Sequence, residues 1–185
     1  MHIFIAGICG TFMAGIALLA REKGIKTVSV TGGEPLIHAS FLAGLLPRFK
    51  KEGLSVYLET AGVHPELLKG VVSWCDVIAM DVKLPSATGR EFWKEHKEFL
   101  NVGRGKIFIK IVIERHTLRR EFEKAVQLAA EAEPPPLLVL QPVTPEQDGI
   151  EPPAEDQLES FRKFAASRLP KVLILPQKHK EWRIR

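Results

Sequence analysis

Short apolar segments alternate with longer amphipathic segments along the whole chain, and this alternation constrains the fold more than any other feature. The apolar segments are rich in Val, Ile and Leu on both faces, which is typical of strands buried in a parallel sheet. We predict strands at His2–Ala6, Thr27–Val30, Leu54–Leu58, Val77–Met80, Ile107–Ile113, Leu137–Leu140 and Val172–Leu175. We predict helices at Phe12–Lys23, Ala39–Glu52, Pro65–Val71, Glu91–Phe99, Leu118–Glu131 and Ala154–Ser167.

A strand followed by a helix, repeated in this way, builds βα units with right-handed crossovers. The sequence therefore predicts an α/β fold with a mostly parallel sheet. Periodicity alone does not distinguish an open, doubly wound sheet from a barrel-like one. In both arrangements, functional groups gather where strands end and helices begin.

The composition fits one soluble domain over residues 1–185, with 45% hydrophobic and 26% charged residues. A net charge of +4 without an aromatic-rich basic repeat predicts neither a nucleic-acid partner nor a membrane partner. The cysteines, Cys9 and Cys75, are too few for a disulfide framework or for a metal cluster with three or four cysteine ligands. We expect a cytoplasmic protein.

The segment after the first strand contains Gly7 and Gly10 in a G-x-x-G spacing. Glycines between a strand and a helix let the backbone approach an anion, although a tight turn needed only for packing explains them equally well. Residues 1–24 resemble the opening of the Mur ligases that recycle muropeptides, which implies a strand–turn–helix from a UDP-sugar-binding domain. The chain has no G-x-x-x-x-G-K-[ST] loop for the ATP that such ligases use.

From about residue 24 onward, the residues at successive strand ends carry a second and longer resemblance. These motifs are Ser29–Pro35, Tyr57–Gly62, Met80–Ser86, Phe108–Val112, Leu140–Pro145 and Leu175–Lys180. In them the chain resembles radical S-adenosylmethionine (SAM) enzymes, and within these the 7-carboxy-7-deazaguanine synthases. The resemblance implies a partial, incomplete TIM-like barrel and a possible homodimer.

Site residues follow from this resemblance position by position. The residues implied to bind SAM are Gly32, Gly33, Glu34, Glu59, Thr60, Asp81, Lys83 and Gln141. Thr31 and the C-terminal Arg185 are implied to face the substrate. From the residues alone, Lys83 is equally a rim lysine with its stem on apolar surface, and Asp81 a cap of the following turn.

The family also uses a [4Fe-4S] cluster, held by a C-x-x-x-C-x-x-C loop after the first strand, and a magnesium ion. Here that location has one cysteine, Cys9, and the magnesium-binding threonine has no counterpart, so we assign no metal ligand and no catalytic residue.

The implied function is ring contraction of a pterin-like substrate, 6-carboxy-tetrahydropterin, in queuosine-type deazapurine biosynthesis. We expect the missing cluster loop to impair it. The alternatives are a non-catalytic SAM- or nucleotide-binding module, a chimera without a ligand, and a UDP-sugar binder.

Overall fold

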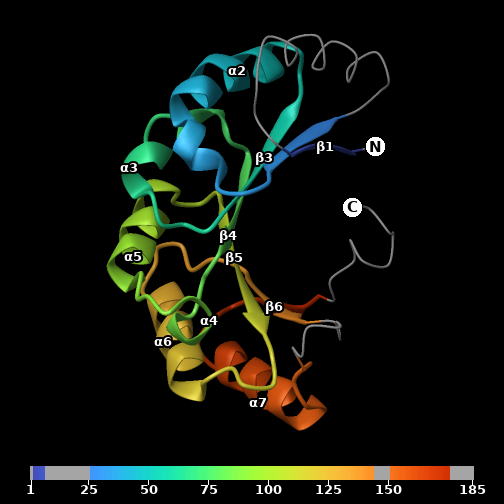
Figure 1. Cartoon of the computed structure of the whole chain (residues 1–185), viewed down its shortest axis with the longest axis vertical. Coiled ribbons are helices and arrows are strands. Elements are labelled where there is room, and N and C mark those ends of the chain that lie inside the picture. The colour runs from blue at the N-terminus through green and yellow to red at the C-terminus, as the bar shows by residue number, and fades with distance from the viewer. Residues whose placement is uncertain (1, 7–25, 144–150, 176–185) are drawn as a thin grey trace.

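The fold is a curved sheet with a layer of helices along one side (Figure 1). The structure is a computed structural model that describes residues 2–6, 26–143 and 151–175, with β1 described by its backbone. Seven parallel strands are hydrogen-bonded in the order in which they occur in the chain. Their bounds are β1 His2–Ala6, β2 Thr27–Thr31, β3 Ser55–Thr60, β4 Val77–Asp81, β5 Ile107–Ile113, β6 Leu138–Pro142 and β7 Val172–Ile174.

From β2 onward, helices connect successive strands and cover the convex side of the sheet (Figure 1). The α-helices are α2 Ala39–Lys51, α3 Pro65–Leu68, α4 Pro85–Thr88, α5 Trp93–Val102, α6 Arg119–Ala130 and α7 Glu155–Ala166. Two 3₁₀ turns, η1 Pro35–His38 and η2 Val72–Trp74, complete the described elements. A doubly wound sheet reverses its strand order at a switch point, whereas this order never reverses. The predicted α/β partial barrel is therefore confirmed.

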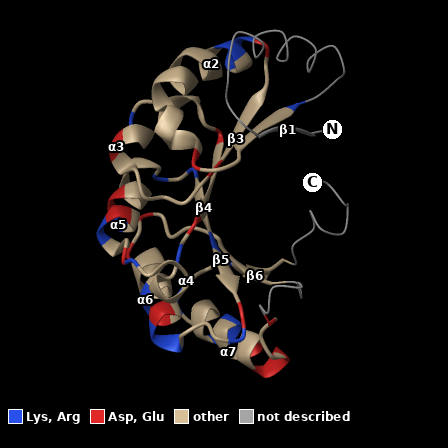
Figure 2. Ribbon diagram, viewed as in Figure 1, with Lys and Arg blue, Asp and Glu red and all other residues tan. Residues whose placement is uncertain are grey.

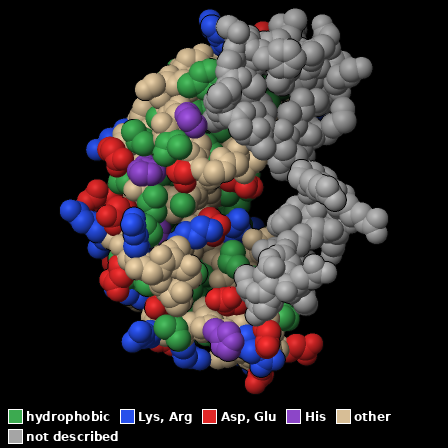
Figure 3. All heavy atoms as spheres, in the orientation of Figure 1, with side chains coloured by type: hydrophobic (Ala, Val, Ile, Leu, Met, Phe, Trp, Pro, Cys, Tyr) green, Lys and Arg blue, Asp and Glu red, His purple; other side chains and the backbone are tan. Residues whose placement is uncertain are grey.

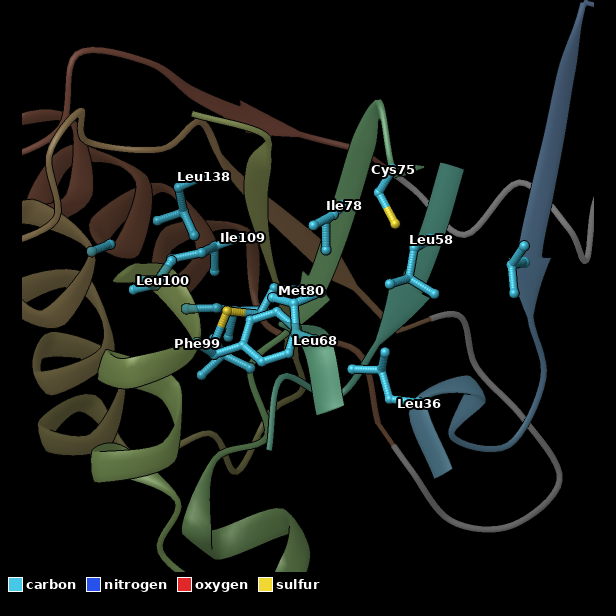
Figure 4. Packing of buried hydrophobic residues seen from close by; sticks show 14 of the residues in the cluster. Leu36, Leu58, Leu68, Cys75, Ile78, Met80, Phe99, Leu100, Ile109 and Leu138 are labelled. Atoms are coloured by element: carbon cyan, nitrogen blue, oxygen red, sulfur yellow. The ribbon is translucent and has the colours of Figure 1, made fainter. Parts of the chain in front are cut away.

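The main core lies between the helices and the sheet. Leu42, Leu45, Leu46 and Phe49 form the buried stripe of α2 at helical spacing. Farther along the sheet, Phe99 of α5 lies against Met80 of β4 (Figure 4). The helices are thus held to the sheet by ordinary apolar packing, which leaves the opposite face of the sheet for other side chains.

Side chains alternate between the two faces of each strand. In β3, Val56, Leu58 and Thr60 are buried, whereas the intervening Tyr57 and Glu59 are partly exposed. In β5 the buried positions are isoleucines, and Lys110 lies between two of them. The concave face therefore carries polar side chains that the apolar core does not require.

The sequence located all seven strands to within two residues at each end. The predicted helix Phe12–Lys23 lies outside the described residues. The predicted Pro65–Val71 helix is a single turn, α3, followed by η2, and α4 and η1 were not predicted. No helix among the described residues is long and apolar enough to cross a membrane.

Both signs of charge are spread along the helices (Figure 2). On the face shown in Figure 3, lysines and arginines are interspersed with aspartates and glutamates. This distribution is typical of a solvated helical layer. The charges that indicate a binding site are therefore those that lie on the sheet.

Candidate functional site

Three polar segments meet at the carboxyl edge of the sheet, directly after β2, β3 and β4. Because β2, β3 and β4 are adjacent and parallel, their carboxyl ends lie at the same edge. The residues that the sequence predicted after separate strands are thereby brought together in space.

Glu59 is held by a hydroxyl from the neighbouring strand. The Oγ1 of Thr31 donates a hydrogen bond to Oε2 of Glu59 at 2.9 Å. Burial raises the pKa of the Tyr57 phenol, and the Glu59 carboxylate raises it further through its charge and a hydrogen bond. Glu59 is thus fixed as a carboxylate acceptor, and Tyr57 is a protonated donor that the sequence did not single out.

The Gly32-Gly33 pair has a backbone that favours glycine, with φ values of 94° and 54°. Both residues are exposed, and a Cβ built on Gly33 would meet no atom within 4 Å. Steric crowding is therefore not what selects glycine at position 33. The left-handed backbone conformation selects it, and it leaves the peptide groups of this turn accessible to a ligand.

Glu34 joins the ends of β2 and β3. Its Oε1 accepts hydrogen bonds from the Leu36 amide at 3.1 Å and from Oγ1 of Thr60 at 2.8 Å. Its Oε2 accepts one from the Ala61 amide at 2.8 Å. Glu34 therefore caps η1 and fixes the turn after β3. Thr60 is buried with its hydroxyl on Glu34, so its predicted contact with a ligand stays a prediction.

Asp81 lies between two lysines. Its Oδ2 is 2.7 Å from Nζ of Lys83 and 3.5 Å from Nζ of Lys110. Its Oδ1 is buried and has no hydrogen-bond partner among the described residues. The cluster thus carries one more positive charge than negative and retains a free acceptor atom, which is an arrangement that a bound ligand can complete.

Lys110 is a site residue that the sequence analysis assigned no role. It pairs in register with Asp81 across β4 and β5. The signal was available, because a lysine in the centre of the run Ile107–Ile113 interrupts an otherwise apolar strand. A charged residue at such a position needs a partner, and Asp81 is that partner.

A cavity of about 210 Å³ lies beside the Asp81 cluster. Its wall includes Asp81 and Lys83 from the end of β4, Val112 from β5, and Val143 directly after β6. Gln141, in β6, pairs in register with Val112 and is half-buried. The cavity is thus a mainly apolar recess with charged groups from the ends of β4 and β5, the latter being Glu114, and Gln141 lies on the adjoining strand.

The cysteines are not at this edge as far as the structure describes them. Cys75 precedes β4 at its amino end, and its thiol contacts the Val71 carbonyl oxygen at 3.5 Å. Burial raises the pKa of the Cys75 thiol to about 11, with Lys106 opposing this shift. Figure 4 shows the thiol near Leu58 on the sheet. Cys75 is a neutral core residue at physiological pH.

Several predicted features lie outside the described residues. These are Arg185, Cys9, the glycine turn with Gly7 and Gly10, and the predicted helix Phe12–Lys23. Among the residues that the structure describes, no group of three or more His, Cys, Asp or Glu side chains is placed to hold a metal ion.

Three curated proteins that share the name 7-carboxy-7-deazaguanine synthase each match at least 80% of the chain. It is 38% identical over 158 residues to the 7-carboxy-7-deazaguanine synthase of Geobacter sulfurreducens, covering 83% of this chain and 62% of that protein. It is 31% identical over 157 residues to the 7-carboxy-7-deazaguanine synthase of Thermococcus kodakarensis, covering 80% and 59%. The chain therefore spans about three fifths of the length of these relatives. No protein-family model matches the chain.

Solved structures share the fold at low sequence identity. A radical SAM methyltransferase from Sphaerobacter thermophilus aligns with a TM-score of 0.62 and 14% identity, over 88% of this chain and 55% of that one. An archaeal TYW1 aligns with a TM-score of 0.59 and 18% identity, over 85% and 58%. These matches give the partial-barrel fold a second line of support, and neither they nor the curated relatives above support the resemblance to Mur ligases.

Proposed function

Because the chain is a homologue of the 7-carboxy-7-deazaguanine synthases and has the fold of radical SAM enzymes, we propose that the carboxyl edge of its sheet binds SAM. The observation that carries the proposal is the convergence of Gly32–Glu34, Glu59 and the Asp81 cluster at that edge. The accessible peptide groups after β2 suit the methionine end of the ligand. The carboxylate of Glu59 suits a pair of ribose hydroxyls, which are hydrogen-bond donors.

The Asp81 cluster has a carboxylate between two lysines, which suits a ligand that carries both a positive and a negative charge. The Oδ1 of Asp81 has no hydrogen-bond partner among the described residues, so the cluster keeps an unused acceptor, and the surplus lysine charge favours an anion. The adjoining cavity is bordered by Val112 and Val143 and suits part of an adenosine. SAM bound here would supply the adenosyl group on which the chemistry of the family depends.

We propose that proteins of this lineage synthesise 7-carboxy-7-deazaguanine, as the names of the relatives state. The substrate would be a pterin-like small molecule, and Thr31 would face it. We further propose a cytoplasmic location. The cysteines of the sequence do not fit a cluster held by three thiolates, because Cys75 is buried at the opposite end of β4. We therefore propose that this chain binds SAM with little or no turnover.

The binding proposal is tested by calorimetric titration with S-adenosylhomocysteine, which lacks the reactive sulfonium. We expect saturable binding that Lys83→Gln weakens about tenfold, the usual order for a charged hydrogen bond. Lys97→Gln is the matched control, since Lys97 makes an exposed ion pair with Glu131 on the helical layer. Absence of binding to the unmutated chain would overturn the proposal.

Turnover is tested separately, by anaerobic incubation with iron, sulfide, SAM and a reductant, followed by a search for 5′-deoxyadenosine. The Geobacter sulfurreducens relative is the positive control. We expect product from the control and none from this chain. Product from this chain at a comparable rate would contradict the expected impairment while leaving the binding proposal intact.

A further inference from the structure

His96 is a completely buried ionisable residue on α5 that the site described above does not use. Neither ring nitrogen has a hydrogen-bond partner among the described residues, and the same holds for Nε1 of Trp93, one turn earlier. A buried polar group without a partner is destabilising, because it has lost its hydrogen bonds to water. Unpaired groups on two side chains of one helical turn therefore require a physical explanation.

The ring of His96 lies between other aromatic rings and the ends of two strands. Its centroid is 6.3 Å from that of Trp93, with the two planes at 80°, and 6.2 Å from that of Phe92. Toward the sheet, the Ala61 carbonyl and the Asp81 carboxylate both act electrostatically on the ring. His96 thus lies directly behind the edge that carries the candidate site.

The turn at Ala61 and Gly62 is fixed from two other directions. The Ala61 amide donates to Glu34 at 2.8 Å. Gly62 has a φ of 70°, and a Cβ built there would lie 2.6 Å from Cγ of Met80. From α5, His96 is near enough to the Ala61 carbonyl for this group to raise the pKa of its ring.

We propose that neutral His96 is a positioning residue that donates one ring N–H to the Ala61 carbonyl and accepts from Nε1–H of Trp93, directly or through one buried water. A neutral imidazole has one donor and one acceptor, which match a carbonyl and an indole N–H. The arrangement explains the unpaired atoms on both side chains. It also gives the turn a restraint on the Ala61 carbonyl, in addition to the bond from the Ala61 amide to Glu34.

The charge state of His96 supports this assignment. Burial lowers the pKa of His96 to about 4, while the Ala61 carbonyl, Glu95 on the same helix and Asp81 on β4 oppose that shift. From α6, Lys124 lies 4.6 Å from the centroid of the Trp93 ring. His96 is therefore neutral at pH 7. Its protonated form has no acceptor and would oppose the Trp93 N–H with a second donor.

The first test is ¹⁵N NMR of the imidazole nitrogens in the full chain without ligand. We expect His96, identified by its loss in His96→Gln, to show one protonated and one unprotonated nitrogen down to pH 5. Trp93→Phe should shift the unprotonated nitrogen. A fast tautomer mixture at pH 7, or titration near 6.5, would overturn the proposal.

The second test is the hydrogen-exchange protection factor of the Ala61 amide. His96→Phe keeps a ring without polar atoms, and we expect protection to fall about tenfold, as for loss of one hydrogen bond. His96→Gln keeps a donor and an acceptor and should restore protection to within about threefold of the native value.

His64→Gln is the control for the second test, because His64 is near the turn but is half-buried and paired with Glu66. We expect this substitution to leave Ala61 protection unchanged. Equal protection in native chain and His96→Phe would overturn the proposal. Both tests omit ligand, so their failure is distinguishable from failure of the proposed function.

Discussion

Two regions at the same edge of the sheet differ in how completely their polar atoms are paired. One is the Glu34 junction, formed by Glu34, Leu36, Thr60 and Ala61, and the other is the Asp81 cluster, formed by Asp81, Lys83 and Lys110. Both oxygens of Glu34 accept hydrogen bonds within the protein, and they join β2 to β3. Asp81 keeps one buried oxygen without a partner among the described residues and lies between two lysines. The comparison indicates that the first region is preorganised by the fold, whereas the second keeps an unpaired acceptor, which we propose that a ligand completes.

This difference separates stability from binding. Changes in the Glu34 junction and the turn that it fixes should reduce the free energy of unfolding. Changes in the Asp81 cluster should reduce ligand affinity with smaller effects on stability. Predictions that break or sharpen the comparison follow from this separation.

The largest effect is expected from Gly62→Ala, in the turn beside Glu34. An alanine at this position would have to adopt the unfavourable left-handed backbone conformation. Its Cβ would also lie 2.6 Å from Cγ of the buried Met80. The backbone conformation costs about 1–2 kcal/mol and overpacking about 1–3 kcal/mol, so we expect a loss of about 3 kcal/mol in urea unfolding. Gly89→Ala is the control, because Gly89 has a φ of 69° with open space around it. Equal losses in the two variants would contradict a packed turn.

Acid should destabilise the region through His96. The pKa of His96 is lowered by burial to about 4 from an ordinary value of 6.5. Since the unfolded chain binds this proton more readily, stability is retained above pH 6.5 and falls as the pH decreases toward 4. The full shift corresponds to about 3 kcal/mol at most. Urea unfolding at pH 7, 6, 5 and 4.5 measures the slope, and His96→Gln should flatten it. The same slope in both proteins would show that other groups cause it.

Glu34→Gln should produce a smaller loss of stability. The amide retains one acceptor oxygen, but its NH₂ group opposes at least one N–H or O–H that now donates to the carboxylate. The loss of charge-assisted hydrogen bonds predicts about 2 kcal/mol in chemical unfolding. Glu98→Gln, on the exposed surface of α5, is the control. A loss below about 0.5 kcal/mol, the usual range for surface substitutions, would show that the junction is not a structural unit.

The sequence predicted features that depend on local residue patterns, and it did not predict contacts that depend on how the elements pack. The strands were located because runs such as Ile107–Ile113 are apolar and short, and these are local properties. The resemblance identified Glu34 and Asp81. Neither source predicted that Glu34 bonds to Thr60 and Ala61, because those bonds depend on the register and curvature of β2 and β3. Lys110 and His96 were missed for a related reason. A polar residue on an apolar element reveals its partner only after the elements are packed.

Asp81→Asn should have the smallest effect on stability and a clear effect on binding. Both lysines remain partly exposed, with side-chain accessibilities of 41% for Lys83 and 24% for Lys110, so solvent compensates part of the lost attraction. We expect the free energy of unfolding to change by less than about 1 kcal/mol. The amide places an N–H donor at one of the two oxygen positions, and therefore removes the free acceptor or the partner of Lys83. Affinity for S-adenosylhomocysteine should fall about tenfold.

The control is Asp76→Asn, because the Asp76 carboxylate also pairs with a lysine, Lys50, but at the amino end of β4. Calorimetry and unfolding of both variants decide the matter, because a ligand-completed cluster predicts weaker binding in Asp81→Asn alone. Unchanged binding in Asp81→Asn, together with a stability loss equal to that of Glu34→Gln, would make the two regions equivalent.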